Sequence, residues 1–123
     1  MARNIARRYT DYPKRYFDVL DFFSGGGTHF SLEGPKNEMA AGRQDYYRFF
    51  SRMREMLLEQ TEAVLNGEEI KGGVDPFLQE YVNTINDISI GMENLGNGQA
   101  RLHFRINPIV AALRRKDEEK NDT

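Results

Sequence analysis

The sequence contains no cysteine. This absence excludes disulfide bonds, cysteine nucleophiles and the usual structural zinc sites, because each of them needs a cysteine sulfur. It also favours a reducing compartment. Any chemistry of this chain would therefore rest on histidine, carboxylate, hydroxyl, lysine or arginine side chains.

A long apolar run is also missing. A membrane-spanning helix needs about 20 consecutive apolar residues, and a secretory signal needs an apolar stretch after its basic start. The start of this chain is basic, but no such stretch follows it. We therefore expect no membrane contact and a cytoplasmic location.

The sequence also lacks the residue patterns that are typical of enzymes. The sequence shows no nucleophile triad, no pair of carboxylates at a catalytic spacing and no metal-ligand spacing, so we expect no enzyme, no cofactor and no metal. Three glycines stand at 25–27, but the Lys-Ser/Thr pair of a phosphate-binding loop does not follow them. They predict a reversal of the chain instead.

What the sequence does contain suits one small domain. Its 123 residues are 39% hydrophobic, which is enough for a single core. The net charge of −2 is unevenly spread, because the first 15 residues hold five basic side chains against Asp11. That gives +4 on this segment and leaves −6 on the remainder. The chain thus begins with a basic arm on an acidic body.

The longest periodic segment spans residues 37–66. Apolar residues recur in it at spacings of three and four, which predicts a long amphipathic helix that packs on a core. We expect Asn37 to cap its start, Asn66-Gly67 to end it, and Phe49 and Phe50 to form the centre of the packing. The predicted buried face consists of Met39, Tyr46, Phe49, Phe50, Met53, Leu57, Gln60 and Val64.

Three shorter helices are predicted at 13–23, 76–86 and 108–116. The first has an apolar face at helical spacing. The other two begin with an Asp-Pro or Asn-Pro pair, in which a capping side chain precedes a proline at the first helical position.

Alternating polar and apolar residues predict a strand at 28–33 and a β-hairpin at 87–106, with its turn at 95–98. The predicted fold is a two-layer α+β domain over 13–114, in which helices cover one face of a small three-stranded sheet. Residues 1–12 form the basic arm. Residues 115–123 form a charged tail that we expect to fray unless a partner holds it.

The other face of this sheet would be bare, and strand parity places both histidines of the chain on it. A metal or acid-base site could use His29, His103 and a glutamate, although their spacing matches no metal family. A charged solvent face is the simplest interpretation, with arginines paired across the strands to Glu33 and Glu93. The predicted bare face consists of His29, Ser31, Glu33, Ser89, Gly91, Glu93, Arg101, His103 and Arg105.

A nucleic-acid surface is the third interpretation of this face. Arg101 and Arg105 lie on one strand with a histidine between them, and the basic arm could clamp phosphates. No aromatic residue for base stacking is expected there, which argues against a single-strand reader. The candidate contacts are Arg3, Arg7, Arg8, Lys14 and Arg15 in or next to the arm, Arg43, Arg48 and Arg52 in the long helix, and Arg101, His103 and Arg105 in the sheet.

The helix arginines also have a simpler interpretation. On a solvated face, Arg52 would pair with Glu55 three residues later and contribute only a few tenths of a kcal/mol.

The segment after the first predicted strand carries a resemblance. It combines Gly34-Pro35, Ala40-Ala41-Gly42, Arg43, Tyr47-Arg48-Phe49-Phe50 and the segment from Arg52 to Arg54. It resembles small uncharacterised proteins encoded by bacteriophages, in which a short strand precedes a helix of the pattern Ala-x-x-x-Arg-x-x-x-Tyr-x-x-Arg. Gly42 and Phe50, where arginine is common, depart from that pattern. The resemblance implies a small accessory protein in the host-cell cytoplasm that binds nucleic acid or a host protein.

Two functional hypotheses follow. The first is a non-enzymatic protein that binds nucleic acid through the arm and the arginine-rich surfaces. The second is a protein-interaction module, either an inhibitor of a host protein or a subunit of a larger assembly. Self-association through the exposed sheet is a further option.

Overall fold

The computed structural model describes residues 12–67 and 74–121. The strands β1 (His29–Pro35), β2 (Ile88–Gly96) and β3 (Gln99–Ile106) form an antiparallel sheet in the order β1-β3-β2. Asn97 and Gly98 connect β2 to β3 with φ angles of 54° and 74°. Such a two-residue Asn-Gly turn matches the twist of the strands, and the predicted hairpin is confirmed.

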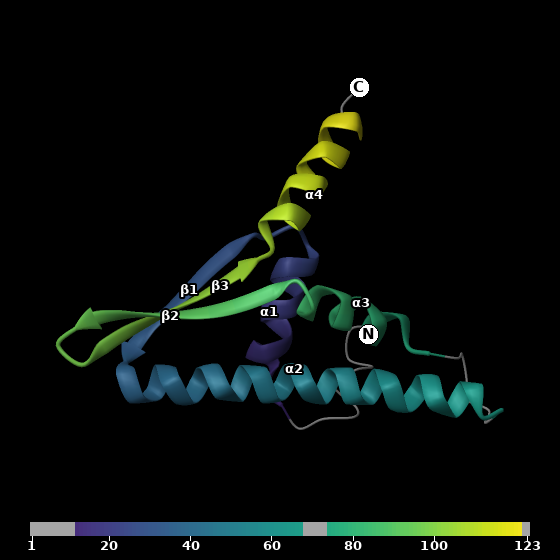
Figure 1. Cartoon of the computed structure of the whole chain (residues 1–123), viewed down its shortest axis with the longest axis horizontal. Coiled ribbons are helices and arrows are strands. Elements are labelled where there is room, and N and C mark those ends of the chain that lie inside the picture. Colours follow the sequence, from purple (N-terminus) through teal and green to yellow (C-terminus); the bar gives the residue numbers. More distant parts are fainter. Residues whose placement is uncertain (1–11, 68–73, 122–123) are drawn as a thin grey trace.

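Helices cover one face of this sheet (Figure 1). The longest, α2 (Lys36–Leu65), crosses the sheet, while α1 (Lys14–Ser24) and α3 (Pro76–Ile85) pack beside it. Asp75 caps α3 by accepting hydrogen bonds from the backbone N–H groups of Phe77 and Leu78 at 2.9 and 3.4 Å. The fold class is α+β with two layers, as the sequence predicts.

The centre of the core lies between α1, α2 and the sheet. Phe49 and Phe50 are buried there, and the Phe49 ring packs against the rings of Tyr12, Tyr16 and Phe17 at centroid distances of 5.0 to 5.3 Å. Tyr12, which the sequence assigned to the arm, thus contacts the core.

The ends of α2 differ from the prediction. The helix begins at Lys36, one residue before the predicted cap Asn37, and no side chain caps its first residues. A tertiary contact holds this end instead, because the backbone N–H of Lys36 donates to the carbonyl of Gly98 at 2.8 Å. At the other end, Val64 is exposed and Met56 is buried. The reason is that this half of α2 runs past the sheet and packs on α3, which changes the buried face.

The last helix, α4 (Pro108–Asn121), continues beyond its predicted end at residue 116 and through most of the segment predicted to fray. Asn107 caps it by accepting a hydrogen bond from the N–H of Ile109 at 2.9 Å. Figure 1 shows that the far part of α4 projects away from the other elements. Among the described residues, no helix combines the length and the apolar character that a bilayer span requires.

Candidate functional site

The polar face of the sheet has the composition that strand parity predicts. Because β3 lies between the other strands, each of its outward residues has a partner on both sides. Arg101 pairs in register with Glu33 and Glu93, and Arg105 pairs with His29 and Ser89. His103 lies between the two arginines, so both histidines are on this face.

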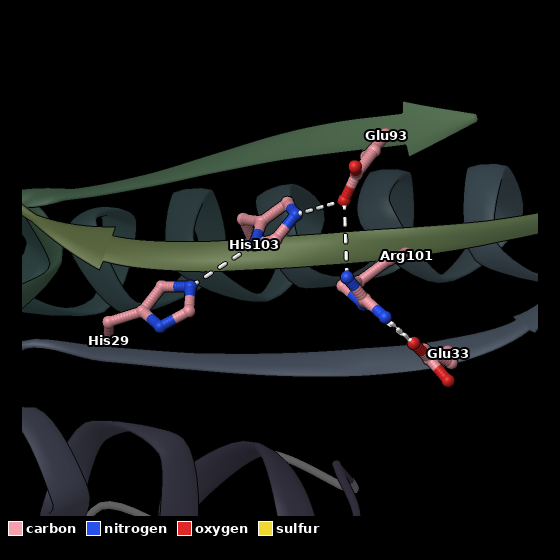
Figure 2. Close-up of polar contacts among 5 residues, drawn as sticks. All are labelled: His29, Glu33, Glu93, Arg101 and His103. Atoms are coloured by element: carbon pink, nitrogen blue, oxygen red, sulfur yellow. Dashed lines mark hydrogen bonds and ion pairs between the residues drawn. The ribbon is translucent and has the colours of Figure 1, made fainter. Parts of the chain in front are cut away.

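The two histidines are joined to each other and to a carboxylate (Figure 2). His103 Nε2 lies 2.8 Å from Glu93 Oε1, and His103 Nδ1 lies 3.1 Å from His29 Nε2. An ionised carboxylate can only accept, so Nε2 of His103 carries the proton toward Glu93. In a neutral His103 ring, Nδ1 then accepts the proton of His29 Nε2. In that neutral state, the carboxylate therefore sets which nitrogen of each ring carries the proton.

Arg101 is neutralised by two carboxylates. Its Nε donates to Glu33 Oε1 at 2.6 Å, and its Nη1 donates to Glu93 Oε1 at 3.4 Å. The hydrogen bond from His103 lowers the pKa of Glu93, assisted by the charge of Arg101. The hydrogen bond to Glu33 raises the pKa of Arg101. For Arg101, the simplest interpretation of this face, a cross-strand ion pair, is confirmed.

The Arg105 guanidinium takes no part in this network of His29, His103, Glu93, Arg101 and Glu33. It makes no hydrogen bond or ion pair with any residue in the described part of the chain, and it borders a depression of about 220 Å³ beside Ser89, Gly91 and His103. Within residues 12–67 and 74–121, no three histidine, aspartate or glutamate side chains converge as metal ligands.

The three arginines predicted in the long helix have internal partners. Arg43 Nε donates to the backbone carbonyl of Ile90 at 2.8 Å, and its guanidinium lies over the Tyr47 ring at 5.6 Å. Arg48 pairs with Asp45 at 3.3 Å. Arg52 pairs with Glu55 at 3.4 Å, the predicted contact, and with Glu59 at 3.3 Å. A phosphate would have to compete with these carboxylates and with the carbonyl.

Of the basic residues predicted at the start of the chain, Arg3, Arg7 and Arg8 lie outside the described residues. Lys14 pairs with Asp18 at 3.6 Å, one helical turn away. The guanidinium of Arg15 lies 5.3 Å from the centroid of the Tyr16 ring. The structure therefore does not bring these two side chains together with the arginines of the sheet in one network.

A second surface, which sequence reasoning missed, is a groove of about 790 Å³ between α1, β1 and the first turns of α2. Its apolar lining includes Phe22 from α1, Leu32 from β1 and Met39 from α2. Phe22 and Leu32 are 44% and 38% exposed, although the Phe22 ring packs against Phe30 and Leu32 lies opposite the buried Leu102. The core is thus left uncovered at this point.

Two glycines shape this groove. A Cβ atom at Gly27 would lie 2.4 Å from the Phe22 ring, so only glycine lets this ring take its place in the wall. Gly42 lies inside α2 and lines the groove, where a Cβ would meet nothing within 4 Å. A glycine within a helix costs about 0.5 to 1 kcal/mol relative to alanine. Packing inside the chain does not explain Gly42, because the space beside it is empty.

The charged residues of the groove are mainly acidic. Asp18, Glu38 and Asp45 line it against the single cation Arg15. Asp18 and Asp45 are paired with basic neighbours on their own helices, whereas Glu38 forms no ion pair with another described residue.

The sequence held two signals for the groove. Phe22 is apolar although it lies off the predicted apolar face of the first helix, and Gly42 interrupts a helix that is otherwise built from good helix formers. Neither signal indicates which elements would border the open space.

In the comparisons with known proteins, no protein family model, curated protein or solved structure matches the chain. The resemblance to bacteriophage-encoded proteins therefore stays a prediction.

Proposed function

We propose that the protein is a non-enzymatic interaction module that binds a protein segment in the groove between α1, β1 and α2. The segment would present apolar side chains on one face and a basic side chain beside them. A cytoplasmic location, expected from the cysteine-free sequence, belongs to the same proposal.

The observation that supports this function is the exposed apolar lining of the groove. Phe22 and Leu32 remain 44% and 38% exposed in a concave surface of about 790 Å³. Concave apolar surfaces with a few polar groups at the rim are typical of binding sites. Covering these side chains would extend the apolar core of the chain without any rearrangement of its elements.

The rim supports the charge of the partner. Three carboxylates against one guanidinium favour a cationic group on the bound segment, and Glu38 is the carboxylate without an ion-pair partner among described residues. Such a rim pair contributes to orientation and association rate more than to affinity.

A substitution at Gly42 tests the proposal without damaging the fold. Gly42→Leu places a side chain in the open space of the groove, and leucine is about 1 kcal/mol better than glycine in a helix. Gln44→Leu is the matched control, because Gln44 is exposed on the same helix and does not line the groove. The stability of both variants should equal or exceed that of the parent chain.

The binding measurement uses a library of displayed random peptides selected on the immobilised full chain. We expect enriched peptides to combine apolar residues with lysine or arginine, and their affinity to fall at least tenfold for Gly42→Leu but not for Gln44→Leu. Peptides that bind the Gly42→Leu chain as well as the parent chain would contradict the proposal.

Nucleic-acid contact is the second candidate function, and Arg105 is the observation that favours it. No carboxylate among the described residues pairs with the Arg105 guanidinium, whereas Arg101 on the same face pairs with Glu33 and Glu93. A phosphate would therefore meet Arg105 without competition from an ion pair. The salt dependence of duplex binding distinguishes this candidate from the groove.

A further inference from the structure

The outer face of α4 is apolar and exposed. Ile109 and Leu113 are 70% and 57% exposed, and Ala112 is exposed between them. Ala112, Leu113 and Lys116 follow Ile109 by three, four and seven residues, which is the spacing of a single helical face. The face thus consists of an apolar stripe that ends in a basic side chain.

This face cannot turn toward its own chain. Val110 and Ala111 on the other side of α4 pack against the core, and Arg114 Nη1 donates to the carbonyl of Phe23 at 2.8 Å. These contacts fix the start of the helix on the end of α1, and Figure 1 shows the rest of α4 directed away from the body. Within residues 12–67 and 74–121, no element covers the stripe, and a second chain can do so.

We propose that α4 of a second copy of this chain occupies the groove, with Ile109 and Leu113 against Phe22 and Leu32. This inference rests on the proposed function of the groove, and it names the partner. The two surfaces match in chemistry. The stripe supplies apolar side chains where the groove has an uncovered lining, and Lys116 supplies a cation where Glu38 has no ion-pair partner among the described residues.

The same chain thus carries both halves of the contact. Two copies that exchange α4 helices reciprocally form a closed dimer, and a contact made in one direction only continues into a longer assembly. Either arrangement covers the two largest exposed apolar side chains of α4, and it gives the helix a partner along its projecting part.

A rival surface for α4 exists on the second half of α2. Leu58 and Leu65 are 58% and 79% exposed there, next to several glutamates. These side chains stand on a convex helix and line neither of the two hollows described above, whereas the groove offers walls on two sides. The groove therefore buries more of an inserted leucine than the convex surface of α2 can.

The test uses full-length chains and measures molar mass by light scattering over a range of concentrations. The groove variant is Gly42→Leu, and the helix variant carries Ile109→Asp and Leu113→Asp, both at exposed positions. Leu65→Asp is the control for the rival surface. We expect the parent chain and Leu65→Asp to associate, and the groove variant and the helix variant each to stay at the mass of one chain.

Mixing supplies the decisive result. The groove variant keeps a native α4 and the helix variant keeps a native groove, so an equal mixture should form a two-chain species that neither forms alone. A parent chain that remains single at all concentrations overturns the inference, as does association that survives in either variant. The peptide selection distinguishes failure of this inference from failure of the proposed function, because the groove can bind peptides even if α4 of a second copy does not enter it.

Discussion

Arg43 and Ile90 join the long helix to the outer edge of the sheet. The Nε atom of Arg43 donates a 2.8 Å hydrogen bond to the carbonyl of Ile90, and the Tyr47 hydroxyl accepts from the backbone N–H of the same residue at 3.2 Å. β2 is an edge strand, whose free backbone groups would otherwise require water or another strand. An arginine predicted to contact phosphate thus protects the sheet edge.

Replacing Arg43 should therefore lower stability. Arg43→Met keeps an unbranched side chain but leaves the Ile90 carbonyl without its charged donor, and we expect a loss of about 1 to 3 kcal/mol in urea unfolding. Arg48→Met is the control, because Arg48 forms only an exposed pair with Asp45, and it should change stability by less than about 0.5 kcal/mol. Equal effects of the two substitutions would show that the edge contact contributes nothing.

The centre of the core gives a second prediction. Phe49 is 0% exposed and touches three aromatic rings from the start of the chain and α1, so Phe49→Ala should cost about 3 to 5 kcal/mol. Leu65→Ala, at a residue that is 79% exposed, should change stability by less than about 0.5 kcal/mol. Thermal unfolding followed by circular dichroism checks both. A cooperative transition at the parent temperature for Phe49→Ala would mean that the packing of α2 is different.

The Glu93 carboxylate makes the stability of the fold depend on pH in the acidic range. Its pKa is lowered in the folded chain by the hydrogen bond from His103 and by Arg101. A lowered folded-state pKa means that Glu93 stabilises the fold above its unfolded pKa, and that this contribution disappears as pH falls through the folded-state value. The parent chain should exceed Glu93→Gln in melting temperature at neutral pH, and the difference should shrink below about pH 4.

Glu62→Gln is the control for this acid dependence, because Glu62 is an exposed glutamate on α2 outside the polar face. At neutral pH, Glu62→Gln should leave the melting temperature close to that of the parent chain. A difference for Glu93→Gln that stays constant from neutral pH to pH about 3 would exclude the linkage.

The polar face gives a prediction for nucleic acid. If this face contacts phosphates, Arg105→Gln should lower the slope of log affinity against log salt by about one unit on a generic duplex. Arg101→Gln should lower it less, because Glu33 and Glu93 already neutralise that guanidinium.

Deleting residues 1–8 tests the basic arm in the same titration, and it removes Arg3, Arg7 and Arg8. Duplex affinity that is unchanged in Arg105→Gln and in the deletion would leave the groove as the candidate interaction surface.

The sequence by itself determined the features that depend on neighbouring residues. The Asp75 and Asn107 caps and the Asn97-Gly98 turn are recognisable because their hydrogen bonds and dihedral angles involve residues only a few positions apart. Alternation along the strands likewise predicted the polar face with both histidines, since side chains of a strand point to opposite sides whatever packs on them. The two-layer fold class follows from these elements.

Only the tertiary structure decided which surfaces are covered. Periodicity in 37–66 predicted an apolar face, but it could not show that α2 passes the sheet and buries Met56 in place of Val64. It also could not show that Arg43 reaches a carbonyl in the edge strand, or that Gly42 opens into a groove beside Phe22. The physical reason is that burial and free volume depend on how distant segments meet, and the residues along one segment do not contain that information.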